Sequence, residues 1–206
     1  FAMLSALCDY KFVAVMPEHM SVERRQIMKA YGAEVVLTPK AADIPGAIAR
    51  YEELKQELAP NLWLPNQFAN EDNVDSHYHT TGNNLMRALP ESADFFVAGV
   101  GTGGTFLGVS KRLREEFPSC RMIAVEPAES AVLSGGKPNL HGIQGIGEGF
   151  VPALIERHRD EIDQVETVTT AEAEATACVL ARRSGIFAGV SAGANVTVAL
   201  RIALQN

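Results

Sequence analysis

Apolar and polar positions alternate along the chain with two periods, one typical of strands and the other of helices. The short apolar runs that predict strands lie at residues 11–16, 34–37, 95–100, 121–126 and 164–168. The longer amphipathic stretches that predict helices lie at residues 21–31, 44–58, 75–89, 105–117, 170–184 and 194–205. Strands that alternate with helices in this way predict an α/β fold, with open and mostly parallel sheets flanked by helices.

A break in the pattern at Pro60 and Pro65, which flank a short apolar stretch, predicts a boundary between two lobes at residues 1–62 and 63–206. The sequence also begins within a helical pattern that has no start signal and ends in one that has no stop signal. We therefore expect it to be the middle and later part of a longer chain, incomplete at the N-terminus.

Composition narrows the class of protein. The 206 residues are 47% hydrophobic, and the net charge of −7 argues against nucleic acid or an anionic membrane as a partner. No apolar run is long enough to span a membrane. Three widely spaced cysteines, Cys8, Cys120 and Cys178, suggest neither a disulfide framework nor a zinc site, and we expect buried thiols in a cytoplasmic protein. The histidines lack the spacing of metal ligands, so no metal site is predicted.

The most informative segment is Gly-Val-Gly-Thr-Gly-Gly-Thr at residues 99–105, between a predicted strand and a predicted helix. Backbone N–H groups converge at such a turn, and the helix dipole favours negative charge there. Glycine lets a ligand approach the main chain closely. The segment therefore predicts a ligand that carries phosphate.

Different phosphate ligands fit this turn. Gly99, Gly101 and Gly104 match G-x-G-x-x-G, and Glu126 ends the next strand where a ribose would lie, as in dinucleotide-binding proteins. The hydroxyls of Thr102 and Thr105 instead suit a single phosphate. A structural turn without a ligand is the third interpretation.

Two further glycine motifs allow more than one interpretation. Residues 189–193, Gly-Val-Ser-Ala-Gly, match the nucleophile elbow of hydrolases, but that fold needs a later histidine and the last one here is His158. Ser191 is otherwise a helix cap or a ligand contact. The glycine-rich residues 142–149 form either a flexible connection or a loop that closes over a substrate.

Seven stretches together resemble the cysteine synthase family, the O-acetylserine sulfhydrylases, over essentially the whole chain. These are fold-type II pyridoxal-phosphate enzymes, like the tryptophan synthase β subunit. The stretches are MPEHMSVERRQIMKAYGAEVVLT from Met16, NQFAN from Asn66, HYHTTG from His77, VAGVGTGGTFLGVSK from Val97, AVEP from Ala124, GIQGIGEGF from Gly142 and GIFAGVSAGANV from Gly185.

The resemblance implies a role for each motif. It implies that Ser191 hydrogen-bonds the pyridine nitrogen of pyridoxal 5'-phosphate, that Gln67 binds the substrate carboxylate, and that the smaller lobe moves to close the site. The residues implied to hold the cofactor phosphate are Gly101, Thr102, Gly103, Gly104 and Thr105. Those implied to line the substrate entrance are Gly145, Ile146 and Gly147.

The resemblance also implies a transferase of cysteine biosynthesis that forms L-cysteine from O-acetyl-L-serine and sulfide. It implies a cytoplasmic homodimer, with serine acetyltransferase as a possible partner. The family's Schiff-base lysine precedes the point where this sequence begins, so we assign no catalytic residue and expect the 206 residues alone to be inactive. Cystathionine β-synthase is a related alternative, and a non-catalytic module that binds a phosphate ligand or a partner protein is another.

Overall fold

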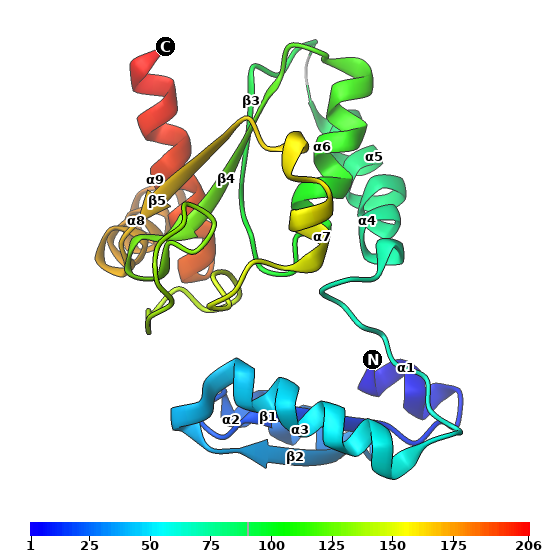
Figure 1. The fold of residues 1–206 in the computed structure, drawn as a ribbon. Helices are drawn as coiled ribbons and strands as arrows, with labels where there is room; N and C mark the ends of the chain where they lie inside the picture. Colours follow the sequence, from blue (N-terminus) through cyan, green and yellow to red (C-terminus); the bar gives the residue numbers. More distant parts are fainter. Residues whose placement is uncertain (90) are drawn as a thin grey trace. The chain divides into compact units, whose positions relative to one another are not determined.

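The computed structural model describes residues 1–89 and 91–206, which form two compact units, Phe1–Leu64 and Pro65–Asn206 (Figure 1). In the first unit β1 and β2 pair in parallel, with Val15 opposite Val36. Helices α2 and α3 pack against this pair. The elements are α1 (Ala2–Leu7), β1 (Val13–Pro17), α2 (Val22–Ala30), β2 (Glu34–Thr38), a 3₁₀ turn (Lys40–Ala42) and α3 (Asp43–Leu58).

The second unit is built on a parallel sheet in the order β3-β4-β5, with Ala98 opposite Ala124 and Ala124 opposite Val165. Its strands are β3 (Phe95–Gly99), β4 (Arg121–Pro127) and β5 (Gln164–Val168). Its helices are α4 (Glu71–His77), α5 (Asn83–Ala88), α6 (Gly104–Glu116), α7 (Ala153–Arg157), α8 (Thr170–Ser184) and α9 (Val190–Gln205). A π-helical turn, Tyr78–Gly82, joins α4 to α5, and short 3₁₀ turns lie at Ala128–Ser130 and Arg159–Glu161.

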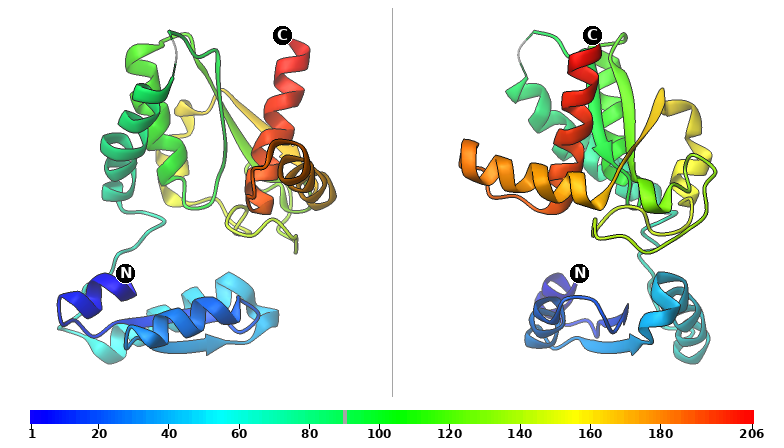
Figure 2. Two further views of the ribbon diagram at one scale, coloured as in Figure 1. Left: turned by 180° about the vertical axis from the view of Figure 1, so that it is seen from behind. Right: turned by 90° about the vertical axis from the view of Figure 1, so that its left-hand side faces the viewer.

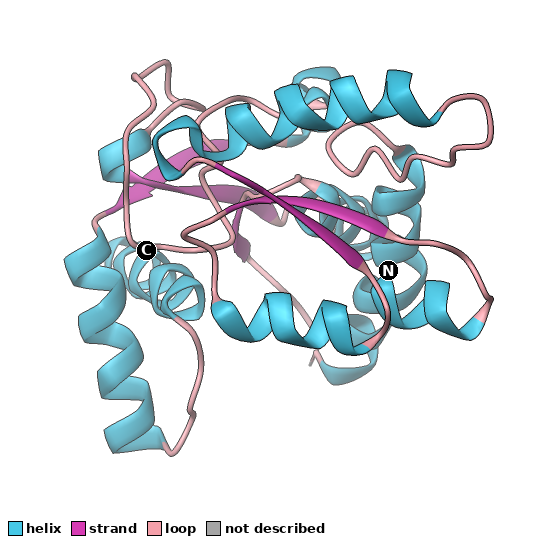
Figure 3. Cartoon of the chain, turned by 90° about the horizontal axis from the view of Figure 1, so that it is seen from below, coloured by secondary structure: helices cyan, strands magenta, loops and turns pink. Residues whose placement is uncertain are grey.

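Helices cover both faces of this sheet. Helices α4 to α7 lie on one side and α8 and α9 on the other (Figure 2). Figure 3 draws the strands of both units in magenta and their helices in cyan. Each face has its own buried cluster, one centred on Phe106, Leu113 and Met122 and the other on Ile123, Val125 and Val198. Because β4 is covered on both faces, its side chains from Met122 to Pro127 are all buried.

The carboxyl ends of the strands form the edge of the sheet that matters for ligand binding. Helix α6 begins at this edge directly after β3, and the N-terminus of α9 lies at the same end (Figure 1). Open parallel sheets bind their ligands outside the carboxyl ends of the strands. The predicted α/β architecture with parallel sheets is confirmed.

The expected helices are present, but two of them begin earlier than predicted, and two of the three cysteines differ from expectation. The helix expected at 75–89 begins earlier, at Glu71, because the side chain of Asn70 accepts a hydrogen bond from the Asp72 N–H and caps it. The last helix begins at Val190 and not at residue 194. Among the three thiols expected to be buried, Cys8 and Cys178 are exposed, because they lie at the end of short α1 and on the outer side of α8.

The start of α8 allows a test of stability. Thr169 Oγ1 accepts from the Glu172 N–H at 3.3 Å, and a Glu172 carboxylate oxygen accepts from the Thr169 N–H at 2.9 Å, which makes a complete capping box. The Thr169 hydroxyl also donates to this carboxylate at 2.7 Å, and this bond, the bond from the Thr169 N–H and Arg201 lower the pKa of Glu172 to about 2. We expect T169A to lower the free energy of unfolding by about 1 kcal/mol in urea titrations. T169S, which keeps the hydroxyl, is the control, and equal losses in the two variants would contradict the capping role.

Candidate functional site

The glycine turn after β3 forms an open N-terminus on α6. Gly103 is the N-cap and has a φ of +94°, a conformation that glycine adopts without the strain of a Cβ. Gly103 has no side chain with which to cap this helix, and the Gly104 N–H reaches the Thr102 hydroxyl oxygen only at the long distance of 3.4 Å. The turn therefore offers backbone donors and the positive end of the helix dipole to an anion.

The glycine-rich loop lies directly against this turn. A Cβ on Gly101 would lie 2.5 Å from the carbonyl oxygen of Gly145, and the Gly147 N–H donates to the Val100 carbonyl at 3.0 Å. The structure thus brings residues 145–147 to the glycine turn. The side chain of Ile146 is buried in the core beside Gly99, so this residue presents its backbone to the site.

Both threonine hydroxyls of the turn have partners on α4. Asn73 Nδ2 donates to Thr102 Oγ1 at 2.9 Å, and His77 Nε2 lies 3.1 Å from Thr105 Oγ1. His77 Nδ1 lies 2.9 Å from Thr81 Oγ1 in the π-helical turn. A π-turn within a helix often marks a functional site. Here it places Thr81 where it can orient the His77 ring.

Burial lowers the pKa of His77 below its ordinary value of 6.5, so the ring is neutral at pH 7. A depressed histidine pKa contributes stability that is complete above about pH 6.5 and is lost as the pH falls through the lowered pKa. We expect the melting temperature of H77Q to fall less than that of the wild type between pH 7 and pH 5. H79Q alters an exposed neighbour and is the matched control. A wild-type slope in H77Q would mean that His77 does not carry this pH dependence.

Gln67 is joined to the same network through its backbone. Asn73 Nδ2 also donates to the Gln67 carbonyl at 2.9 Å, while the side chain of Gln67 is exposed. Asn66, which precedes it, has a φ of +46°. The side-chain amide of Asn73 thus connects the segment that contains Gln67 to the glycine turn.

Ser191 lies in the first turn of α9, whose N-cap is Gly189. The helix has already begun at Ser191, so this residue is not the helix cap that the sequence left open. One turn later, Asn195 Oδ1 is buried without a hydrogen-bond partner and faces Gly99, where a Cβ would lie 3.3 Å away. The half-buried Ser191 therefore stands on a helix that packs beside the carboxyl end of β3.

Glu126 does not have the role that a dinucleotide would require. Its carboxylate is 1% exposed and accepts hydrogen bonds from the Leu133 N–H at 2.7 Å, the Ser134 N–H at 3.0 Å and the Ser134 hydroxyl at 2.5 Å. These bonds bind it to the loop that follows β4, so it is not available to a ribose. The dinucleotide interpretation requires an acidic side chain that can bind a ribose, and Glu126 does not meet this requirement.

The same loop is held at its far end by His141. The Ile143 N–H donates to His141 Nδ1 at 3.2 Å, so the ring hydrogen lies on Nε2, which donates to the Gly147 carbonyl at 2.8 Å. Gly147 has a φ of +68° and lies against Pro127. These contacts fix the backbone of residues 145–147 beside the turn, in place of the flexible connection that the sequence left open.

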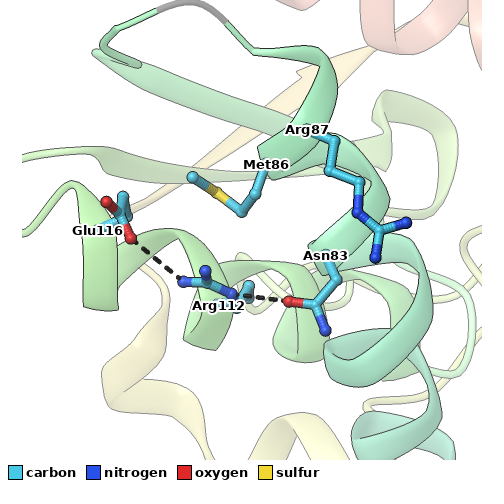
Figure 4. Close-up of a pocket in the computed structure, with 5 residues that line it drawn as sticks. All are labelled: Asn83, Met86, Arg87, Arg112 and Glu116. Atoms are coloured by element: carbon cyan, nitrogen blue, oxygen red, sulfur yellow. Dashed lines mark hydrogen bonds and ion pairs between the residues drawn. The ribbon is translucent and has the colours of Figure 1, made fainter.

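A separate pocket of about 470 Å³ lies between α5 and the later half of α6. In Figure 4 Arg112 bridges Asn83 and Glu116 across it, with Met86 and Arg87 beside them. Arg112 follows Gly104 by eight residues, which corresponds to about 12 Å along the helix. The residues that line this pocket are therefore distinct from those of the glycine turn.

Within residues 1–89 and 91–206, no group of three or more His, Cys, Asp or Glu side chains could hold a metal ion. No helix in this part of the chain is long and apolar enough to cross a membrane.

Comparison with known proteins identifies the family. The family model described as "Pyridoxal-phosphate dependent enzyme" matches residues 1–206. The chain belongs to this family. It is 46% identical to the cysteine synthase of a Flavobacterium species over 91% of this chain and 60% of that protein. It is 43% identical to the cysteine synthase of Staphylococcus aureus over 99% of this chain and 65% of that protein. The chain thus spans about three fifths to two thirds of the length of these relatives.

Solved structures show the same fold. The cysteine synthase of Entamoeba histolytica is 38% identical and superposes with a TM-score of 0.91 over 98% of this chain and 59% of that one. The O-acetylserine-dependent cystathionine β-synthase of Helicobacter pylori is 39% identical, with a TM-score of 0.92 over the whole of this chain and 66% of that one. The resemblance to fold-type II pyridoxal-phosphate enzymes is confirmed, and pyridoxal phosphate is the cofactor that the family implies.

The donors at the turn fit the phosphate of that cofactor. The hydroxyls of Thr102 and Thr105 lie at the N-terminus of α6, where the first backbone N–H groups and the helix dipole favour an anion. Two residues that contact the threonine hydroxyls, Asn73 and His77, are not among the candidates drawn from the sequence. His77 begins one of the motifs quoted there, and Asn73 lies between that motif and the one that begins at Asn66.

Proposed function

We propose that this chain is the cofactor-phosphate-binding part of an O-acetylserine sulfhydrylase, which forms L-cysteine from O-acetyl-L-serine and sulfide. The observation that carries the proposal is the turn at residues 101–105, where hydroxyls and helix N–H groups converge beside the glycine loop. Cysteine synthases at 43–46% identity over most of this chain support it.

Each motif has a role in this proposal. Pyridoxal phosphate supplies an electron sink for reactions at the α and β carbons of an amino acid. The residues that hold its phosphate are Gly101, Thr102, Gly103, Gly104 and Thr105. The hydroxyl of Ser191 hydrogen-bonds the pyridine nitrogen. A serine, unlike an aspartate, need not keep that nitrogen protonated, which suits loss of a good leaving group such as acetate.

The substrate is held by a second set of residues. Gln67 binds its carboxylate through the exposed side chain, and the backbone of residues 145–147 lines its entrance. The first unit, Phe1–Leu64, is the part that moves during closure. None of the six lysines in the sequence has the context of the family's Schiff-base lysine, so we assign that role to none of them.

The proposal is tested with the whole protein, loaded with pyridoxal phosphate and supplied with O-acetylserine and sulfide. We expect cysteine to form, and S191A to lower the rate. Because a serine at this site acts through the ring nitrogen, S191A should also shift the visible absorbance of the bound cofactor. Binding of pyridoxal phosphate without any cysteine formation would overturn the proposed reaction and favour a non-catalytic module.

A second candidate is cystathionine synthesis. The relative from Helicobacter pylori, named an O-acetylserine-dependent cystathionine β-synthase, covers the whole chain at 39% identity. Homocysteine supplied in place of sulfide separates the two activities, because it would give cystathionine. A higher kcat/KM with homocysteine than with sulfide would favour this second candidate.

We further propose that the whole protein is a cytoplasmic homodimer, and that serine acetyltransferase binds at the mouth of its active site. The molar mass of the whole protein, measured by light scattering, tests whether it is a dimer. Competition between an acetyltransferase C-terminal peptide and O-acetylserine tests whether the acetyltransferase binds at the active site.

A further inference from the structure

Two glycines let α4 approach α6 closely. A Cβ at Gly104 would fall within the side-chain amide of Asn73, and a Cβ at Gly108 would fall against the carbonyl oxygen of Val74. Both glycines are buried and one helical turn apart, so they make a flat strip on which α4 lies. This close packing allows polar side chains of α4 to reach the hydroxyls at the start of α6.

Asn73 uses its amide NH₂ group twice. Nδ2 donates to the Thr102 hydroxyl oxygen at 2.9 Å and to the Gln67 backbone carbonyl at 2.9 Å. A carbonyl oxygen accepts hydrogen bonds and cannot donate them. The Gln67 carbonyl therefore requires the NH₂ side of the amide at this position, which makes Asn73 a donor to Thr102 as well.

This arrangement fixes the direction of the Thr102 hydroxyl. A threonine oxygen has one hydrogen and two acceptor positions. Asn73 occupies one acceptor position, and the Gly104 N–H, at 3.4 Å, approaches the other. The hydroxyl hydrogen cannot point toward either of these donors. It is therefore free to donate to a ligand that binds at the turn.

His77 does not fix Thr105 in the same way. The neutral imidazole has one donor and one acceptor nitrogen, and both of its partners are hydroxyls that can act in either role. The hydroxyl direction at Thr105 can therefore reverse together with the tautomer. Asn73 is the residue of α4 whose contacts allow one direction only.

We propose that Asn73 is a positioning residue, which holds the Thr102 hydroxyl as a donor to the cofactor phosphate and ties this hydroxyl to the Gln67 segment. The inference rests on the proposed function, because it needs pyridoxal phosphate at the turn. It adds a residue that does not touch the cofactor and acts through Thr102.

The decisive variant is N73D. Aspartate has nearly the same shape, but as a carboxylate it only accepts hydrogen bonds. It would repel the Gln67 carbonyl and draw the Thr102 hydrogen toward itself, and its charge would oppose the phosphate. We expect the Kd for pyridoxal phosphate to rise roughly ten- to a hundredfold, the effect of losing a hydrogen bond to a charged group. N73A removes the amide without reversing the hydroxyl and should raise the Kd less.

Two readouts separate positioning from general damage. Pyridoxal, which lacks the phosphate, should bind N73D within about threefold of its wild-type Kd. The ³¹P chemical shift of bound pyridoxal phosphate should change in N73D. N84D is the matched control, because it adds the same charge at exposed Asn84 of α5, whose side-chain oxygen accepts from Arg87 and remains an acceptor in aspartate. Its Kd for pyridoxal phosphate should stay near the wild-type value.

The possible failures are distinguishable. If the wild type does not bind pyridoxal phosphate, the proposed function fails together with this inference. If the wild type binds and N73D binds equally well with the same ³¹P shift, the role of Asn73 is overturned while the function stands. Equal losses for pyridoxal and pyridoxal phosphate would show that Asn73 is merely structural, which also overturns the inference.

Discussion

G193A is expected to destabilise the second unit by about 3 kcal/mol or more, at or above the upper end of the usual cost of overpacking. A Cβ at Gly193 would collide with the carbonyl oxygen of Ala173 and lie 2.9 Å from the Ala177 nitrogen. Both are backbone atoms of α8, so no side chain can rotate away to make room. Alanine gains about 1 kcal/mol of helix propensity over glycine, which is too little to offset the collision.

The measurement is urea unfolding followed by circular dichroism. G189A is the matched control, because Gly189 lies just before the same helix and an added Cβ would meet no atom within 4 Å. It should change the free energy of unfolding by less than about 0.5 kcal/mol. A G193A protein as stable as G189A would show that α8 and α9 have room to separate. Because Ser191 stands in the first turn of α9, a shift of this helix should also weaken binding of pyridoxal phosphate.

The strands of this fold could be predicted well from sequence. Each of the five strands in the described residues coincides, within two residues at either end, with a short apolar run bounded by turn residues. The start of α4 was missed because residues 71–73 are polar, and a polar segment gives no apolar periodicity from which a helix can be predicted. The capping amide of Asn70 determines that start, and an asparagine in a polar stretch suits a loop equally well.

The candidate site could be predicted in part. The turn at residues 99–105 carries its own local signal, because glycine spacing and a following helix define an anion site without knowledge of the rest of the fold. The pairing of Asn73 with Thr102 spans 29 residues and depends on how closely α4 packs against α6. No local pattern in the sequence indicates such a long-range contact. For Glu126 the sequence pattern was misleading. Its spacing from the glycine motif is typical of a residue that binds ribose, but its carboxylate bonds to Leu133 and Ser134 in the loop that follows β4.

The buried carboxylate of Glu126 leads to the second large expected effect. E126A would leave the Leu133 and Ser134 N–H groups without their acceptor, and Leu133 is buried. An unsatisfied buried donor costs about 1–3 kcal/mol, so we expect a loss of about 2–4 kcal/mol in the free energy of unfolding. E126Q keeps one acceptor oxygen but turns an NH₂ group toward a donor, and should lose about half as much.

Amide hydrogen exchange tests where this loss arises. In E126A the Leu133 and Ser134 amides should lose protection first, because the carboxylate holds them directly, while amides in β4 should follow only the global change. The loop continues to residues 145–147, which press against Gly101, so its loosening should also raise the Kd for pyridoxal phosphate. Unchanged protection at Leu133 in E126A would contradict the role of Glu126 as the anchor of this loop. Protection that is lost there while the affinity for pyridoxal phosphate is kept would show that His141 alone holds the far end of the loop in place.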